Sequence, residues 1–186
     1  MATKLNLGSG LQKVAGFINI DRIFGSEAYP LTSYAHESVA EVRASHILEH
    51  FPRAQVAEVI KEWVRVLAPD GWLSIAVPDF DWIVAHCKRN DLPIEGYLMG
   101  GQTDESDYHK VIFDEMKLTR LMTDAGLVDV QRWKSDIGDA ASLPVSLNLK
   151  GRKPARSEQA VSQSNNLEVK AKTVAIGSVP RLGWQA

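Results

Sequence analysis

Short apolar runs alternate with longer segments of helical periodicity along the first 150 residues. Apolar runs or apolar–polar alternation predict strands, whereas apolar residues spaced three and four apart predict helices. The expected strands are 5–7, 17–20, 40–47, 72–77, 127–133 and 143–149. The expected helices are 53–67, 80–88 and 114–125, the last with Asp114 as N-cap and Gly126 beyond its end. This order is typical of an α/β protein with a largely parallel sheet.

Two parts of the chain depart from this pattern. Residues 11–16 are too few for the crossover helix that normally joins two parallel strands, and 91–108 is irregular. After residue 150 the composition changes: 152–166 is polar without periodicity, and 167–179 regains alternation. We therefore expect a domain at 1–150, followed by a polar linker and a basic C-terminal arm at 151–186.

Composition excludes several classes of protein. The net charge of −2 provides no general attraction to nucleic acid or anionic membranes. The single cysteine, Cys87, excludes an internal disulfide. No apolar run is long enough to span a membrane, and the first residues lack the apolar core of a signal peptide. A cytoplasmic location is therefore expected.

Candidate chemistry lies where the first two strands end. Gly8, Ser9 and Gly10 follow the first strand, and Asp21 follows the second. Ligands of open parallel sheets bind beyond the carboxyl ends of the strands, and glycines let the backbone approach a ligand closely. A carboxylate there can accept hydrogen bonds from both ribose hydroxyls. The pattern favours a nucleoside pocket, although a plain tight turn and a solvated acid remain alternatives.

Three motifs occur in the order expected of a known family. They are Leu5-Asn-Leu-Gly-Ser-Gly10, Ser45-His-Ile-Leu-Glu-His-Phe51 and Leu67-Ala-Pro-Asp-Gly-Trp-Leu73. Together with Asp21 they make residues 5–149 resemble the class I S-adenosylmethionine-dependent methyltransferases. The resemblance implies a Rossmann-like, doubly wound, mostly parallel sheet with an antiparallel C-terminal strand. Within that family the chain looks similar to a small subgroup with an abbreviated first helix, whose members often accompany polysaccharide-assembly enzymes.

The resemblance implies S-adenosylmethionine as the cofactor. The glycine turn lacks the third glycine of a dinucleotide fingerprint, and no helix follows whose N-terminus would hold a pyrophosphate. A ligand without phosphates therefore fits better than NAD. The residues expected to bind it are Asn6, Gly8, Ser9, Gly10, Asp21, Leu31, Ser45, His46 and Leu48. Among these, Leu31 is expected to pack on the adenine from the position of the family's third strand, at 29–31.

Histidines are the candidates for the acceptor side. His50 is the expected catalytic base, because an imidazole titrates near neutral pH, although a structural role is an alternative. Asp79 and His109 are expected to bind substrate, with helix capping as the alternative for Asp79. The spacing of His46, His50 and His109 fits no common zinc pattern, so no metal is expected.

These observations favour methyl transfer to a small or glycan-linked acceptor, most readily at oxygen. A non-catalytic binding module with the same fold and a nicotinamide-dependent oxidoreductase are the rival interpretations. A nucleic-acid methyltransferase is not favoured, because the body lacks a basic face with aromatic residues. The oligomeric state stays open, with a homodimer formed through the C-terminal arm as one arrangement.

Overall fold

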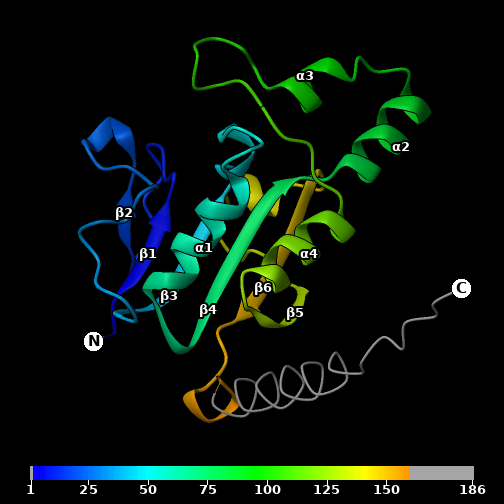
Figure 1. Cartoon of the computed structure of the whole chain (residues 1–186). Coiled ribbons are helices and arrows are strands. Elements are labelled where there is room, and N and C mark those ends of the chain that lie inside the picture. Colours follow the sequence, from blue (N-terminus) through cyan, green and yellow to red (C-terminus); the bar gives the residue numbers. More distant parts are fainter. Residues whose placement is uncertain (1, 160–186) are drawn as a thin grey trace, which may run out of the picture. The chain divides into compact units, whose positions relative to one another are not determined.

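Six strands form one sheet in the order β2-β1-β3-β4-β6-β5 (Figure 1). Their bounds are β1 Lys4–Leu7, β2 Ile18–Ile20, β3 Val39–Ser45, β4 Leu67–Pro78, β5 Val128–Arg132 and β6 Ser146–Arg152. Strands β1 to β4 pair in parallel, whereas β6 is antiparallel to both of its neighbours, β4 and β5. The expected α/β class, with a mostly parallel sheet and an antiparallel C-terminal strand, is confirmed.

The computed structural model describes residues 2–159. The chain divides into two compact units after Lys153, and residues 156–159 of the second unit are helical. The arm predicted at 167–179 lies outside the described residues. Within the described part, no helix is both long and apolar enough to cross a bilayer.

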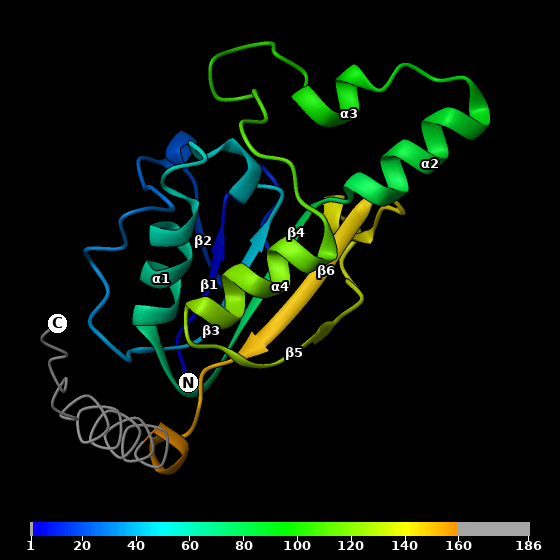
Figure 2. The ribbon, with the colours of Figure 1, turned by 45° about the vertical axis from the view of Figure 1, so that its right-hand side comes forward.

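Two helices cover one face of the sheet. The helices are α1 Val56–Val66, α2 Phe80–Asn90, α3 Glu95–Met99 and α4 Glu115–Asp124. Helix α1 packs on β4, α4 packs on β5 and β6, and the two helices pack on each other, so both lie on the same face (Figure 2). The apolar stripe predicted for the first helix is buried against the sheet, with Trp63 at its centre fully enclosed. Helices α2 and α3 follow the carboxyl end of β4 (Figure 1).

The opposite face of the sheet carries a network of polar side chains. Arg43 of β3 is nearly fully buried there, donates to Asn6 Oδ1 (3.2 Å) and pairs with Asp139. Asn6 in turn donates to Asn19 Oδ1 (2.9 Å). A buried charge is tolerated when it is paired and hydrogen-bonded in this way. The face is therefore held by a side-chain network that joins β1, β2 and β3 to the segment before β6.

The expected third strand at 29–31 is wrong: in the described chain these residues form no strand. The backbone of Leu31 bonds to side chains of α1 instead of to a neighbouring strand. Its amide donates to Glu62 Oε1 (2.9 Å), and its carbonyl accepts from Arg65 Nη2 (3.1 Å). The sheet consequently ends at β2, and the leucine side chain is buried in the core.

Other boundaries differ by a few residues. The last strand, β6, begins at Ser146 rather than at residue 143. Strand β4 begins at Leu67 rather than at residue 72, with a register shift against β3 between Val39 and Glu41. Residues 11–16 form turns without a helix, as their number predicts.

Candidate active site

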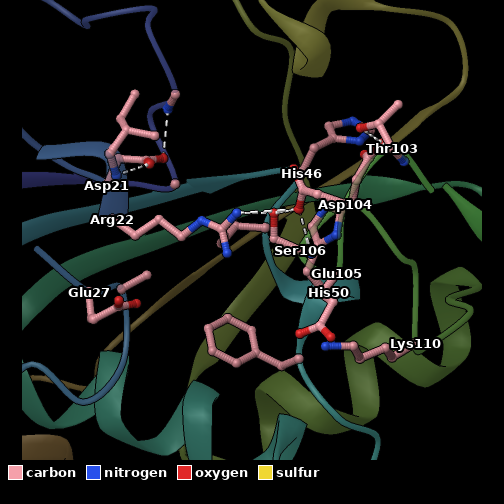
Figure 3. A pocket seen from close by; sticks show the side chains of 17 residues that line it. Asp21, Arg22, Glu27, His46, His50, Thr103, Asp104, Glu105, Ser106 and Lys110 are labelled. Atoms are coloured by element: carbon pink, nitrogen blue, oxygen red, sulfur yellow. Dashed lines mark hydrogen bonds and ion pairs between the residues drawn. The ribbon is translucent and has the colours of Figure 1, made fainter. Parts of the chain in front are cut away.

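A cavity of about 710 Å³ opens where β1, β2 and β3 end (Figure 3). Its wall is formed by the glycine turn after β1, the acid after β2, the segment after β3, and a loop at 103–110. The lining residues are Gly8, Gly10, Asp21, Arg22, Ile23, Glu27, Ala28, His46, Ile47, His50, Phe51, Thr103, Asp104, Glu105, Ser106, Asp107 and Lys110. The volume lies in the range of small-molecule sites, at the edge of the sheet where such ligands bind.

The two glycines of the turn have different surroundings. Gly8 (φ 65°) donates its amide to the Ile20 carbonyl (2.9 Å), and a Cβ there would lie 2.6 Å from the Ile47 Cβ. Gly10 (φ 53°) faces open space, since a Cβ there would meet no atom within 4 Å. Gly8 is therefore needed for packing against the segment after β3, whereas Gly10 leaves room in the cavity.

Asp21 joins the glycine turn after β1 to the segment after β2. Its Oδ2 accepts from the Gly10 amide (2.8 Å), and its Oδ1 accepts from the Ile23 amide (3.0 Å). Each carboxylate oxygen has a second lone pair, so both can still accept a ligand hydroxyl. The carboxylate is thus held by the backbone at the cavity wall (Figure 3).

A link crosses the cavity from the segment after β2. The guanidinium of Arg22 lies 3.5 Å from Asp104 Oδ1 and also hydrogen-bonds Ser106, on the far wall (Figure 3). Hydrogen bonds from Ser106, together with Arg22, lower the pKa of Asp104. The sequence marks 91–108 as irregular but does not identify Arg22, Glu27, Lys110 or the loop 103–107 as site residues. The only signal was the number of acids between residues 91 and 108.

Histidines and a glutamate gather below the loop. Among the described residues, neither carboxylate oxygen of the fully buried Glu49 has a hydrogen-bond partner. Nδ1 of His46 lies 3.2 Å from Glu49 Oε1, and His46 Nε2 is 2.9 Å from the Ser146 hydroxyl. The rings of His50 and His109 meet edge to face, 5.0 Å apart. Burial lowers the pKa of His109, and the charge of Glu49 opposes this effect.

Glu49 does not act at the start of the helix that follows it. A carboxylate at a helix N-terminus commonly complements the helix dipole. Glu49 instead lies in the short 3₁₀ helix Leu48–His50 and is enclosed beside the histidines.

Some predicted site residues do not line the cavity. Leu31 and Leu48 are buried in the core, and Asn6 belongs to the polar network on the opposite face of the sheet. Asp79 caps α2, accepting from the amides of Asp81 (3.1 Å) and Trp82 (3.2 Å). Ser9, Ser45 and His109 also lie outside the lining set, although His109 contacts His50, which is in it.

Comparison with known proteins identifies the fold. No protein-family profile matches the chain, and no curated protein sequence matches it. A methyltransferase from Thermotoga maritima superposes with a TM-score of 0.57 at 15% identity, over 82% of this chain and 83% of that one. One from Archaeoglobus fulgidus gives 0.57 at 14% identity, over 82% and 86%. Both are described as S-adenosylmethionine-dependent. The chain has the class I methyltransferase fold.

A third neighbour shows the same methyltransferase fold with a ligand. It is the Burkholderia thailandensis 1,6-didemethyltoxoflavin-N1-methyltransferase, with S-adenosylhomocysteine and its acceptor bound. Its TM-score is 0.52 at 17% identity, over 82% of this chain and 71% of that one. In the present protein, Gly8, Gly10, Asp21 and His50 line the same cavity.

Proposed function

We propose that this chain is an S-adenosylmethionine-dependent methyltransferase that methylates an oxygen of a small or glycan-linked acceptor. One observation carries the proposal: a methyltransferase fold keeps an open cavity at the carboxyl ends of its first strands, with Gly10 and Asp21 in the wall. The glycan part rests on the resemblance of the sequence to a subgroup that accompanies polysaccharide-assembly enzymes.

The residues present fit this cofactor. The open space at Gly10 leaves room for a ligand against the backbone. The amides of the turn already donate within the protein, so its carbonyl oxygens are the groups that can accept from the ammonium of an amino-acid moiety. Asp21 would accept from the ribose hydroxyls, and His46 and Ile47 would border the same space. When bound, the cofactor supplies an activated methyl group on a sulfonium. The short link between β1 and β2 forms no helix whose N-terminus would hold a pyrophosphate beside the glycine turn.

We assign His50 to the acceptor side. It lines the cavity from the segment after β3, and its Nδ1 lies 3.2 Å from the Tyr108 carbonyl, which fixes the ring. An acceptor held between His50 and the loop 103–107 would be shielded from water by the Arg22 link. Positioning of the two reactants accounts for much of the rate in such a displacement. Replacement of His50 by Gln should therefore lower kcat more than cofactor affinity.

Calorimetry with S-adenosylhomocysteine tests the proposal. Wild-type protein should bind one equivalent, and Asp21→Asn should bind more weakly by about 1.5–3 kcal/mol, the usual worth of hydrogen bonds to a charged group, or roughly 10- to 150-fold. Asp124→Asn, an exposed acid at the end of α4, is the matched control and should bind normally. A folded wild-type protein that does not bind this ligand would refute the enzyme assignment and favour a binding module. Binding of NADH instead would favour the oxidoreductase.

A further inference from the structure

Glu49, His50 and His109 place three metal-ligating groups together. One ligand atom from each residue lies within 4.8 Å of the others. Histidine spacing along the sequence did not predict this group, because it omitted Glu49 and included His46. The fold brings His109 to the other two from 59 positions beyond His50 in the chain, so only the tertiary structure shows it.

The carboxylate of Glu49 has one ionisable neighbour, His46, and no hydrogen bond among the described residues. It is fully buried, and no donor among the described residues bonds to either oxygen. The nearest candidate, His46 Nδ1 at 3.2 Å, makes an ion pair only when that ring is protonated. A buried carboxylate without hydrogen bonds is costly, and a bound cation would remove this cost.

The His50 imidazole is oriented as a metal ligand usually is. Nδ1 of His50 lies 3.2 Å from the Tyr108 carbonyl, and at His109 the backbone of Tyr97 opposes the lowering of the pKa by burial. In metal sites, a ligating histidine commonly donates its second nitrogen to such a backbone carbonyl, which leaves the other nitrogen free for the ion. For His50, the nitrogen left free is Nε2.

Backbone hydrogen bonds hold the two segments in place. The Lys110 amide donates to the Glu49 carbonyl (2.7 Å), and the His109 amide donates to the Met99 carbonyl (3.0 Å). The three ligand atoms, up to 4.8 Å apart, would have to move closer to reach the roughly 3.4 Å separation that ligand distances near 2.1 Å imply around tetrahedral zinc.

We propose that Glu49, His50 and His109 bind a divalent transition-metal ion of the zinc type, with an open position toward the cavity. Two imidazoles and one carboxylate are a ligand set that such ions accept while keeping room for water or substrate. His50 connects the site to the cavity because it lines the wall.

The role of the ion deepens the proposed function and rests on it. The ion coordinates the acceptor hydroxyl and lowers its pKa, so that its proton passes to water. The acceptor oxygen then forms the new bond to the methyl carbon while the carbon–sulfur bond breaks, and S-adenosylhomocysteine leaves. In this arrangement His50 acts as a ligand rather than as the base predicted from sequence. The favoured acceptor is one whose hydroxyl can reach the ion.

Metal binding is tested on tag-free, chelator-treated full-length protein with Zn²⁺ in calorimetry and with Co²⁺ in visible absorption. Wild type should bind one ion per chain and give the d–d bands of Co²⁺ with nitrogen and oxygen ligands. Glu49→Gln and His109→Asn should each weaken binding by at least tenfold. His36→Gln, an exposed histidine elsewhere, should bind like wild type. Wild-type binding no tighter than that of Glu49→Gln would overturn the site.

A thermal shift provides a second readout that does not depend on activity. Without metal, Glu49→Gln should melt at or above the temperature of wild type, because it removes a buried charge that no hydrogen bond satisfies. Zn²⁺ should raise the melting temperature of wild type, since ligands that bind the native state stabilise it, and should leave Glu49→Gln unchanged. Equal Zn²⁺ shifts in both proteins would contradict the inference.

The metal site and the proposed function can fail separately. Binding of S-adenosylhomocysteine without Zn²⁺ binding would refute the metal site and support the methyltransferase proposal. Zn²⁺ binding to Glu49 and the histidines without S-adenosylhomocysteine binding keeps the site and removes the methyltransferase. Methyl transfer that survives chelation unchanged in a protein shown to bind Zn²⁺ would refute the role of the ion.

Discussion

Alanine at Gly8 and at Gly10 should have different consequences, although both residues have a left-handed backbone. Their φ values are 65° and 53°, a conformation that costs roughly 1–2 kcal/mol for a residue with a side chain. At Gly8 the new Cβ would also lie 2.6 Å from the Cβ of Ile47 and 2.8 Å from its Cγ1, whereas at Gly10 it would meet nothing within 4 Å.

The expected loss of stability follows from these contacts. Gly10→Ala should cost about 1–2 kcal/mol from the backbone alone. Gly8→Ala should cost about 1–3 kcal/mol more, the usual penalty for overpacking a core. The entropy that alanine removes from the unfolded chain is common to both variants, so it cancels in the difference. Ile47→Gly added to Gly8→Ala removes the Ile47 Cβ as well as its Cγ1, and it should recover part of the loss, as a coupling of at least about 0.5 kcal/mol.

Urea unfolding followed by tryptophan fluorescence measures this difference, because Trp63 is fully buried. Calorimetry with S-adenosylhomocysteine should show the reverse order among folded proteins: Gly10→Ala should lose more affinity, because its Cβ enters the cavity. Equal free energies of unfolding for the two variants, or no coupling between Gly8 and Ile47, would refute the packing argument.

Two further changes test residues outside the cavity. The hydrogen bond from Arg65 is the main cause that lowers the pKa of Glu62. This pair therefore stabilises the fold at pH values above the ordinary carboxyl pKa of about 4.3. The stabilisation is lost as the pH falls through the lower pKa of the folded state. Glu62→Gln should therefore be less stable at pH 7, and its stability should fall less steeply with acidification in urea titrations at several pH values; parallel curves would contradict this. Asp79→Ala should cost about 1 kcal/mol as a lost N-cap and leave S-adenosylhomocysteine affinity unchanged in calorimetry, whereas a large loss of affinity would restore Asp79 to the site.

Local sequence pattern predicted the strands and the site residues that depend on strand ends. The first four strands, the apolar stripe of α1 and the Asp114 cap of α4 depend on periodicity and capping chemistry within a few residues, and the structure has all of them. The placement of Gly10 and Asp21 at one cavity wall follows because parallel strands end at the same edge of the sheet.

Long-range contacts were not predictable in this way. Leu31 is not part of a strand, because its backbone bonds the side chains of Glu62 and Arg65, more than 30 residues later in the chain. The proximity of Glu49 and His109 depends on the path of the loop after α3, which has no periodicity to read. Such partners are decided by tertiary packing, on which sequence spacing carries no information.

The Arg22 link has a consequence for exchange of whatever occupies the cavity. The side chains of Arg22 and Asp104 are 55% and 62% exposed, and ion pairs so accessible to water contribute only about 0–1 kcal/mol. That is comparable to thermal energy, so the Arg22 link opens spontaneously. Salt screens the attraction between the two charges and weakens the link further. The dissociation rate of a bound ligand is then set by its contacts with the cavity wall. The Arg22 link affects only how often the entrance is open.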